Sequence, residues 1–309
     1  MKKVIIAAST YAVHSTEPLK YLDQMNINVV KNLLSRKLTP KELVDLASGA
    51  QGIIAGTETY SFEVLDQLPQ LKVISRLGVG MDNIELKATK DIGIKVFKTT
   101  TTPAPAVAEL TMGLMLDIAR KISQSNLDLR TGKWEKKMGS LIKEKTLGII
   151  GLGTIGKALV ELSSGFDFQI LAFDQKKDKS FAEENDITYC DLNTLLKYSD
   201  IVTIHLNLSD QTKCLIDEEK VNLMKSGSIL INTSRGEIID EKSLYNALKE
   251  KRILGAGLDV FNDEPYSGPL TELENVVLTP HIGAYAKEIR VQMEIEAAQN
   301  LIKGLNDEQ

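Results

Sequence analysis

The chain has 309 residues, of which 43% are hydrophobic and 26% charged, with a formal net charge of −5. This composition is typical of a globular protein, and the length favours two domains because a single hydrophobic core stops growing at roughly 250–300 residues. The small acidic excess provides no basic stripe for nucleic acid, and no apolar run approaches the ~20 residues that cross a membrane. We therefore expect neither nucleic acid nor a membrane as a partner.

The N-terminal sequence MKKVIIAAS has a basic start followed by small apolar residues, so a signal peptide has to be considered. Its apolar run is short, and the Val4-Ile5-Ile6 pattern is typical of a first buried strand, which is the interpretation we adopt. Cys190 and Cys214 stand alone, without metal-ligand spacing or a disulfide framework. Both suit a reducing compartment, and we expect a cytoplasmic protein.

Short β-branched runs alternate with helical stretches from the N-terminus to about residue 98. The predicted strands are 4–9, 52–56, 72–75 and 94–97, and the predicted helices are 62–69 and 84–93, each ending at Gly or Pro. A second series predicts strands at 146–151, 170–174, 200–206, 228–234, 256–261 and 276–280, with helices at 191–200 and 240–251. Continuous rather than alternating apolar strands are buried on both faces, and strand–helix alternation predicts parallel sheets covered by helices.

The segment 99–121 separates the two series, and a long apolar helix begins in it near Pro105. Another long helix is expected over 284–304, where it would return to the first domain. We therefore predict two doubly wound parallel-sheet α/β domains, one formed by 1–99 with 285–309 and the other by 100–284. The Met and Leu residues of 110–118 suggest core or a subunit interface, and Trp134 is expected to pack against a domain face.

Gly151, Gly153 and Gly156 have the G-x-G-x-x-G spacing, directly after a predicted strand and at the start of a helix. A second strand follows and completes the βαβ unit that this motif requires for dinucleotide binding. The glycines permit a tight turn, close approach of the backbone to a pyrophosphate, and packing of the helix on the strand. The amides of Thr154 and Ile155 would face the phosphates at the helix N-terminus.

Asp174 ends the second strand of this unit. Its carboxylate would accept hydrogen bonds from both ribose hydroxyls and repel a 2′-phosphate, so the predicted cofactor is NAD rather than NADP. Lys176 and Lys177, just beyond it, weaken that preference.

Arg235, Glu264 and His281 lie at or just after the ends of predicted strands, where ligands bind in open α/β sheets. Hydride transfer to a 2-oxo acid leaves negative charge on the carbonyl oxygen, and a histidine is a suitable proton donor near neutral pH. A carboxylate bound to the imidazole fixes its tautomer and favours its protonated form, while an arginine polarises the carbonyl and pairs with the substrate carboxylate. Pro280 and Gly283 would fix the backbone so that the His281 side chain projects into a cleft.

Six motifs make the chain resemble the D-isomer-specific 2-hydroxyacid dehydrogenases, the family of phosphoglycerate dehydrogenase and glyoxylate/hydroxypyruvate reductase. The resemblance covers essentially the whole chain. It implies a Rossmann NAD-binding domain, a flavodoxin-like substrate domain with a cleft between the two, and a homodimer. The motifs are SRLGVGMDNIEL (75–86), VAEL (107–110), GIIGLGTIG (148–156), NTSRGEIID (232–240), GLDVFNDEP (257–265) and TPHIGA (279–284).

The resemblance also implies roles for single residues. His281 would be the acid/base, Glu264 would tune its imidazole, and Arg235 would bind the substrate. The backbone of Gly78, Val79 and Gly80 would hold the substrate carboxylate. Residues implied to line the cofactor, besides the glycine-rich turn and Asp174, are His205, Asn207, Thr212, Thr233, Ser234, Asp259 and Gly283.

The resemblance leaves the substrate open. The leading candidate is 3-phosphoglycerate with 3-phosphohydroxypyruvate, and the alternatives are glyoxylate, hydroxypyruvate or another 2-oxo acid. Phosphoglycerate dehydrogenases usually have Arg and Lys after the strand that corresponds to 52–56, where this chain has Gly56, Thr57, Glu58 and Thr59. Arg76 either compensates for them or forms a structural ion pair. The alternative from a different class is an NAD(H)-sensing binding protein of the corepressor type. Such a protein shares the fold and the equivalents of Arg235, Glu264 and His281, but it would not turn over a substrate.

Overall fold

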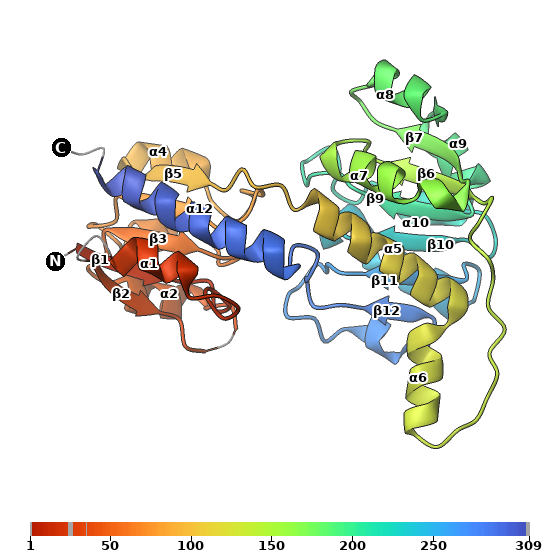
Figure 1. The fold of residues 1–309 in the computed structure, drawn as a ribbon, viewed down its shortest axis with the longest axis horizontal. Helices are drawn as coiled ribbons and strands as arrows, with labels where there is room; N and C mark the ends of the chain where they lie inside the picture. Colours follow the sequence, from red (N-terminus) through yellow and green to blue (C-terminus); the bar gives the residue numbers. More distant parts are fainter. Residues whose placement is uncertain (1, 24–26, 35, 307–309) are drawn as a thin grey trace. The chain divides into compact units, whose positions relative to one another are not determined.

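The computed structural model describes residues 2–23, 27–34 and 36–306, and the chain folds into two compact units. The first unit comprises Met1–Pro103 with Tyr285–Gln309, and the second comprises Ala104–Ala284. Each unit has one sheet whose paired strands all run parallel (Figure 1). The predicted fold class, two doubly wound parallel-sheet domains, is confirmed.

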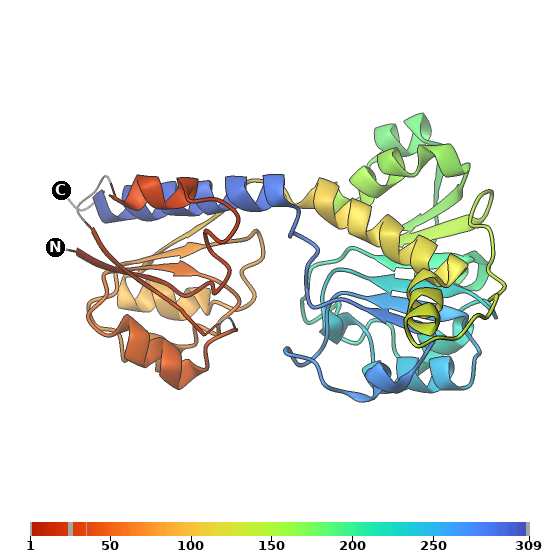
Figure 2. The ribbon, with the colours of Figure 1, turned by 60° about the horizontal axis from the view of Figure 1, so that its bottom comes forward.

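The first unit has a five-stranded sheet in the order β2-β1-β3-β4-β5. Helices α1 and α12 cover one face and α2, α3 and α4 cover the other, each over its own apolar cluster (Figure 2). The strand order reverses between β1 and β3, which is where open parallel sheets bind ligands. The bounds are β1 Lys2–Ile6, α1 Glu17–Asp23, β2 Ile27–Lys31, α2 Pro40–Ala47, β3 Gly52–Ala55, α3 Phe62–Leu65, β4 Val73–Arg76, α4 Leu86–Ile92, β5 Lys95–Lys98 and α12 Lys287–Asn306.

The second unit has a seven-stranded sheet in the order β12-β11-β10-β9-β6-β7-β8. Helices α5, α7 and α8 pack on one face and α9, α10 and α11 on the other. The bounds are α5 Ala104–Arg120, α6 Ile122–Arg130, β6 Thr146–Ile150, α7 Thr154–Leu162, β7 Gln169–Phe173, α8 Lys179–Glu184, β8 Ile187–Tyr189, α9 Leu192–Tyr198, β9 Ile201–Ile204, α10 Glu218–Leu223, β10 Ile229–Asn232, α11 Glu241–Lys249, β11 Gly255–Leu258 and β12 Val276–Leu278.

Two strands were not predicted, β2 and β8, and both lie at a sheet edge. In β2 the apolar residues of INVVK are only partly buried, and β8 has three residues. An edge strand pairs with one neighbour only, and in these two the sequence lacks the continuous apolar run of a central strand, whereas the edge strands β5 and β12 keep enough of it to be predicted.

Helix α5 is a core helix, because Met112, Leu114 and Met115 within the stretch 110–118 are buried in the second unit. Helix α6 has no buried residue, and Figure 1 shows it turning away from the end of α5. The prediction for Trp134 is wrong, since its side chain is 83% exposed. Lys137 Nζ lies 2.9 Å from Asp128 Oδ2 on α6. This ion pair connects the segment after α6 to the helix, while the indole of Trp134 stays in solvent.

No helix in the described part of the chain is long and apolar enough to span a membrane.

Candidate active site

The predicted cofactor site lies where the strand order of the second sheet reverses, between β6 and β9. Gly151 follows β6 with a φ of +98°, and a Cβ at this position would lie 2.7 Å from the carbonyl oxygen of His205. Only glycine allows both that backbone angle and that approach. The loops after β6 and β9 therefore touch at the switch point, the place where doubly wound sheets bind dinucleotides.

The remaining glycines of the motif shape the start of α7. Gly153 is the N-cap and Thr154 the first helical residue. A Cβ on Gly156 would lie 2.5 Å from the carbonyl oxygen of Gly151, so this position too excludes a side chain. The first-turn amides of α7 have no partner within the helix, and they provide N–H groups and a helix dipole suited to a pyrophosphate.

Asp174 follows β7, and its carboxylate is held by two backbone donors. Oδ2 accepts from the amide of Leu152 and Oδ1 from the amide of Lys176, both at 2.8 Å. Lys177 lies over the ring of Tyr189, 5.6 Å from its centroid. The carboxylate is thus fixed beside the glycine-rich turn, as a ribose ligand requires.

His205 follows β9, and its imidazole is neutral. Nε2 lies 2.9 Å from Oγ1 of Thr203, while the buried Nδ1 has no hydrogen-bond partner among the described residues. Burial lowers the pKa of His205 to about 3. An orphan buried nitrogen at the switch point fits a site that a polar ligand completes.

Asn207 and Thr212, further along the same loop, are joined to each other. Thr212 Oγ1 donates to the carbonyl oxygen of Asn207 at 2.7 Å. The loop after β9 is therefore closed on itself beside the predicted cofactor site.

The loop after β10 is fixed by Asn232. Its Oδ1 accepts from the amide and the hydroxyl of Ser234 at 3.0 and 2.8 Å, and its Nδ2 donates to the carbonyl oxygen of Arg235 at 2.8 Å. Thr233 Oγ1 lies 3.1 Å from Thr111 Oγ1 on α5. Thr233 and Ser234 are buried, so this loop presents Arg235 from a rigid base.

Gly236 brings the Arg235 loop against the turn that carries Glu264. A Cβ on Gly236 would lie 2.1 Å from the carbonyl carbon of Phe261 and 2.5 Å from the amide nitrogen of Asn262. Both atoms belong to the backbone and cannot rotate away. The charge of Arg235 contributes to lowering the pKa of Glu264, which agrees with this close packing.

Glu264 and His281, which the sequence predicted as a catalytic couple, are in hydrogen-bonding contact. Glu264 Oε2 lies 2.8 Å from His281 Nδ1, and the other carboxylate oxygen accepts from the amide of Phe261 at 3.2 Å. Burial by itself would raise the pKa of Glu264, but the hydrogen bond and charge of His281 hold it below its ordinary value. The side chains of Glu264 and His281 are 31% and 38% exposed, so both remain partly accessible from solvent.

Asp259 fixes the backbone on which His281 stands. Its Oδ1 accepts from Thr279 Oγ1 and from the amide of Ile282, and its Oδ2 from the amide of Gly283, at 2.6, 2.8 and 2.7 Å. Burial raises the pKa of Asp259, and the three donors oppose that rise.

The backbone at His281 differs from the expected arrangement. His281 itself has a φ of +54°, and Gly283 does not have a positive φ. The left-handed angle is unfavourable for a residue with a Cβ. It is held because the Asp259 carboxylate binds the two amides that follow.

Gly78, Val79 and Gly80 follow β4 in the first unit. The amide of Gly78 donates to Thr99 Oγ1 at 3.1 Å, and Val79 is 41% exposed. Behind them, Arg76 is only 9% exposed and donates from Nε to Asn83 Oδ1 at 3.2 Å and from Nη1 to the carbonyl oxygen of Leu77.

Glu58 is buried as well. Its Oε2 accepts from the amide of Gly56 at 2.9 Å and from the hydroxyl of Tyr60 at 3.4 Å. The residue is 2% exposed, so its carboxylate is enclosed within the loop after β3.

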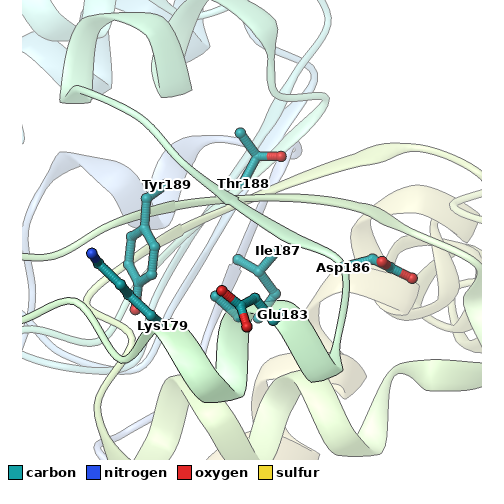
Figure 3. Close-up of a pocket in the computed structure, with 7 residues that line it drawn as sticks. Lys179, Glu183, Asp186, Ile187, Thr188 and Tyr189 are labelled. Atoms are coloured by element: carbon teal, nitrogen blue, oxygen red, sulfur yellow. The ribbon is translucent and has the colours of Figure 1, made fainter.

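A pocket of about 460 Å³ lies between α8 and β8, lined by residues that include Lys179, Glu183 and Tyr189 (Figure 3). None of the predicted site residues lines it. No cluster suited to hold a metal ion occurs within 2–23, 27–34 and 36–306.

Several contributors to the site were not found from the sequence: Thr203, Asn232, Gly236 and the Phe261 amide. Asn232 and Gly236 flank Arg235 in the NTSRGEIID motif, so the motif itself carried a signal. Thr203 and Phe261 act through contacts that appear only in the folded chain.

Comparison with known proteins agrees with this geometry. Residues 112–283 match the family model described as D-isomer specific 2-hydroxyacid dehydrogenase, NAD binding domain. The hydroxypyruvate reductase of Thermotoga maritima is 38% identical over 304 residues, which cover 96% of this chain and 98% of that protein. The D-3-phosphoglycerate dehydrogenase of Methanocaldococcus jannaschii is 40% identical over 276 residues, 88% of this chain but 53% of that protein. Among solved structures, the TT0316 protein of Thermus thermophilus has a TM-score of 0.88 at 31% identity and covers 99% of this chain and 97% of that one.

The fold, the family match and these relatives define an NAD-dependent oxidoreductase. The chain belongs to the D-isomer-specific 2-hydroxyacid dehydrogenase family.

Proposed function

We propose that the protein reduces a small, unphosphorylated 2-oxo acid to the D-2-hydroxy acid, with hydroxypyruvate or glyoxylate as substrate. The observation that carries the proposal is the 2.8 Å contact between Glu264 Oε2 and His281 Nδ1. Because Nδ1 is occupied, Nε2 is the imidazole nitrogen that is left to exchange a proton with the substrate oxygen. Bound NADH supplies the hydride to C2.

We assign each remaining role to the residue whose surroundings suit it. Arg235 pairs with the carboxylate or carbonyl oxygen of the substrate, since the guanidinium of an arginine can donate two parallel hydrogen bonds to such oxygens. The Gly78–Gly80 loop binds the substrate carboxylate through the amides of Val79 and Gly80, since the Gly78 amide donates to Thr99 Oγ1. The start of α7 and Asp174 hold the cofactor, with Asp259 and Gly283 near the nicotinamide. In the proposed reduction, the carbonyl oxygen gains the His281 proton as C2 gains the hydride.

The substrate assignment is supported by the loop after β3. It reads Gly56-Thr57-Glu58-Thr59-Tyr60 and contains no cation. Arg76 is buried and engaged with Asn83 and the Leu77 carbonyl, which supports a structural role over phosphate binding. The hydroxypyruvate reductase relative, matched over nearly its full length, supports the same class of substrate.

Phosphoglycerate is the second candidate. The M. jannaschii D-3-phosphoglycerate dehydrogenase is 40% identical, and this chain spans about half its length. Strong preference for 3-phosphohydroxypyruvate would mean that a basic residue outside the loop after β3 binds the phosphate.

The test is NADH oxidation with hydroxypyruvate, glyoxylate, pyruvate, 2-oxoglutarate and 3-phosphohydroxypyruvate, beside NADH binding measured by fluorescence. We expect turnover with an unphosphorylated acid. His281→Gln should keep NADH binding and reduce turnover by roughly 10²–10⁴-fold, the usual contribution of a general acid. NADH binding without oxidation of any acid would support the corepressor-type sensor instead, and full activity in the variant would refute the role of His281.

We also propose a homodimer formed through α6 and the segment that follows it. Leu127, Leu129, Trp134, Met138 and Leu141 are each more than half exposed. Five large apolar side chains exposed within fifteen residues suit an interface better than solvent, and a second copy of this segment would cover them.

The two cysteines, Cys190 and Cys214, are free thiols, and a cytoplasmic location is part of the same proposal.

A further inference from the structure

The turn that carries Glu264 is built on two stacked rings. Phe261 and Tyr266 have ring centroids 4.3 Å apart and an interplanar angle of 19°. The amide of Phe261 donates to Glu264 Oε1 at 3.2 Å. Phe261 is 7% exposed and forms part of the core beneath the turn. The carboxylate that meets His281 is therefore connected to Tyr266 through one amide and one ring stack.

Tyr266 connects the turn to α11. Its hydroxyl donates to Glu241 Oε1 at 2.8 Å and accepts from the amide of Leu270 at 3.3 Å. Glu241 is the first residue of α11. Burial, together with the hydrogen bond to Glu241, raises the pKa of Tyr266 to about 12. The phenol stays protonated and donates at any pH at which the protein is assayed.

We propose that Tyr266 and Glu241 are positioning residues that hold the carboxylate of Glu264 on Nδ1 of His281. The proposal rests on the proposed acid/base role of His281. Neither residue touches the reacting atoms. Both act by fixing the C-terminal end of the turn, whose N-terminal end is fixed by Asp259 through the 279–283 backbone.

The charged groups around His281 explain what a loose turn would change. Glu264 binds Nδ1, the Asp259 carboxylate binds the adjoining backbone, and Arg235 lies near Glu264. Of these groups, Glu264 is the one whose side chain contacts the imidazole itself. If its carboxylate moves, Nδ1 loses the partner that orients the ring, and fewer molecules present Nε2 to the substrate oxygen.

The experiment compares Tyr266→Phe, Glu241→Ala and Glu241→Gln in the NADH-dependent reduction of the best substrate. Tyr245→Phe is the matched control. Tyr245 lies on α11, the helix that begins with Glu241, and its ring has a cation–π contact with Lys249. Glu241 and Tyr245 also line a surface hollow of about 470 Å³, so substitutions there remove little packing. The measurements are kcat, KM for both substrates, the pH profile and the melting temperature.

We expect Tyr266→Phe and Glu241→Ala to lower kcat by about tenfold, less than the roughly 10²-fold cost of a 1 Å displacement. KM for NADH should stay unchanged, so the loss should lie in kcat. Glu241→Gln keeps an acceptor for the phenol and should restore most of kcat.

Two results would overturn the proposal. One is that Tyr266→Phe has the kcat and pH profile of Tyr245→Phe, and the other is that its melting temperature falls without a change in either. The variant His281→Gln separates this outcome from failure of the proposed function. If His281→Gln loses activity, the acid/base role of His281 is still supported, and only the positioning role of Tyr266 and Glu241 is refuted.

Discussion

Replacing Gly236 by alanine tests the close packing between the Arg235 loop and the Glu264 turn. The new methyl group would lie 2.1 Å from the carbonyl carbon of Phe261, 2.4 Å from its oxygen and 2.5 Å from the Asn262 nitrogen. Favourable contacts between heavy atoms begin at about 3.5 Å. All three atoms belong to the backbone, so the two loops must separate by about 1 Å.

A separation of this size should affect catalysis more than folding. Misplacing reacting groups by about 1 Å can cost on the order of 10²-fold in rate, and that is the loss of kcat that we expect. Forcing an extra methyl group into a packed site costs about 1–3 kcal/mol of unfolding free energy. NADH binding should persist, because Gly151 and Asp174 belong to other loops.

The assay is steady-state NADH oxidation with the best 2-oxo acid, combined with NADH titration and thermal unfolding. Gly165→Ala is the control, since a Cβ at this position in the second unit meets no atom within 4 Å. The reasoning is refuted if Gly236→Ala is folded and retains kcat within about twofold of the control, which would be an energetically negligible change.

Three further predictions concern the cofactor site and the assembly. Asp174→Ala should shift the ratio of kcat/KM toward NADPH by about tenfold or more, the worth of a charged hydrogen bond; an unchanged ratio would remove Asp174 as the ribose ligand. The pKa of His205 is about 3 when folded and ordinarily 6.5, so the unfolded chain takes up the proton first and stability falls as the pH drops between these values. His205→Asn should flatten that dependence in urea titrations, and a parallel curve would contradict the burial argument. Leu127→Glu should give a monomer by light scattering. The control Tyr198→Glu, at a position 65% exposed on α9, should stay dimeric. A monomeric native protein would refute the dimer proposal.

The central strands could be predicted because burial on both faces leaves a local mark. The predicted strands 146–151 and 200–206, for example, are short apolar runs bounded by turns, and they contain β6 (146–150) and β9 (201–204). The strands β2 and β8 lack that mark, because no residue of β2 is fully buried and β8 has only three residues, of which one is buried. The exposure of Trp134 was mispredicted for a related reason. An apolar residue is ordinarily buried, and no local sequence pattern reveals that the segment around Trp134 makes few contacts with the rest of its chain.

The sequence by itself determined the doubly wound sheets and the glycine-rich turn, and it singled out Arg235, Glu264 and His281 as candidates, since each depends on short-range pattern or motif spacing. The tertiary structure decided how these residues are held. The left-handed backbone of His281 depends on the Asp259 carboxylate 22 positions earlier in the chain. The contact of Gly236 with Phe261 and the bond from Tyr266 to Glu241 likewise join separate loops. Such contacts form only when strands distant in sequence become neighbours in the sheet, because their energy comes from packing across the fold and not from local conformational preference.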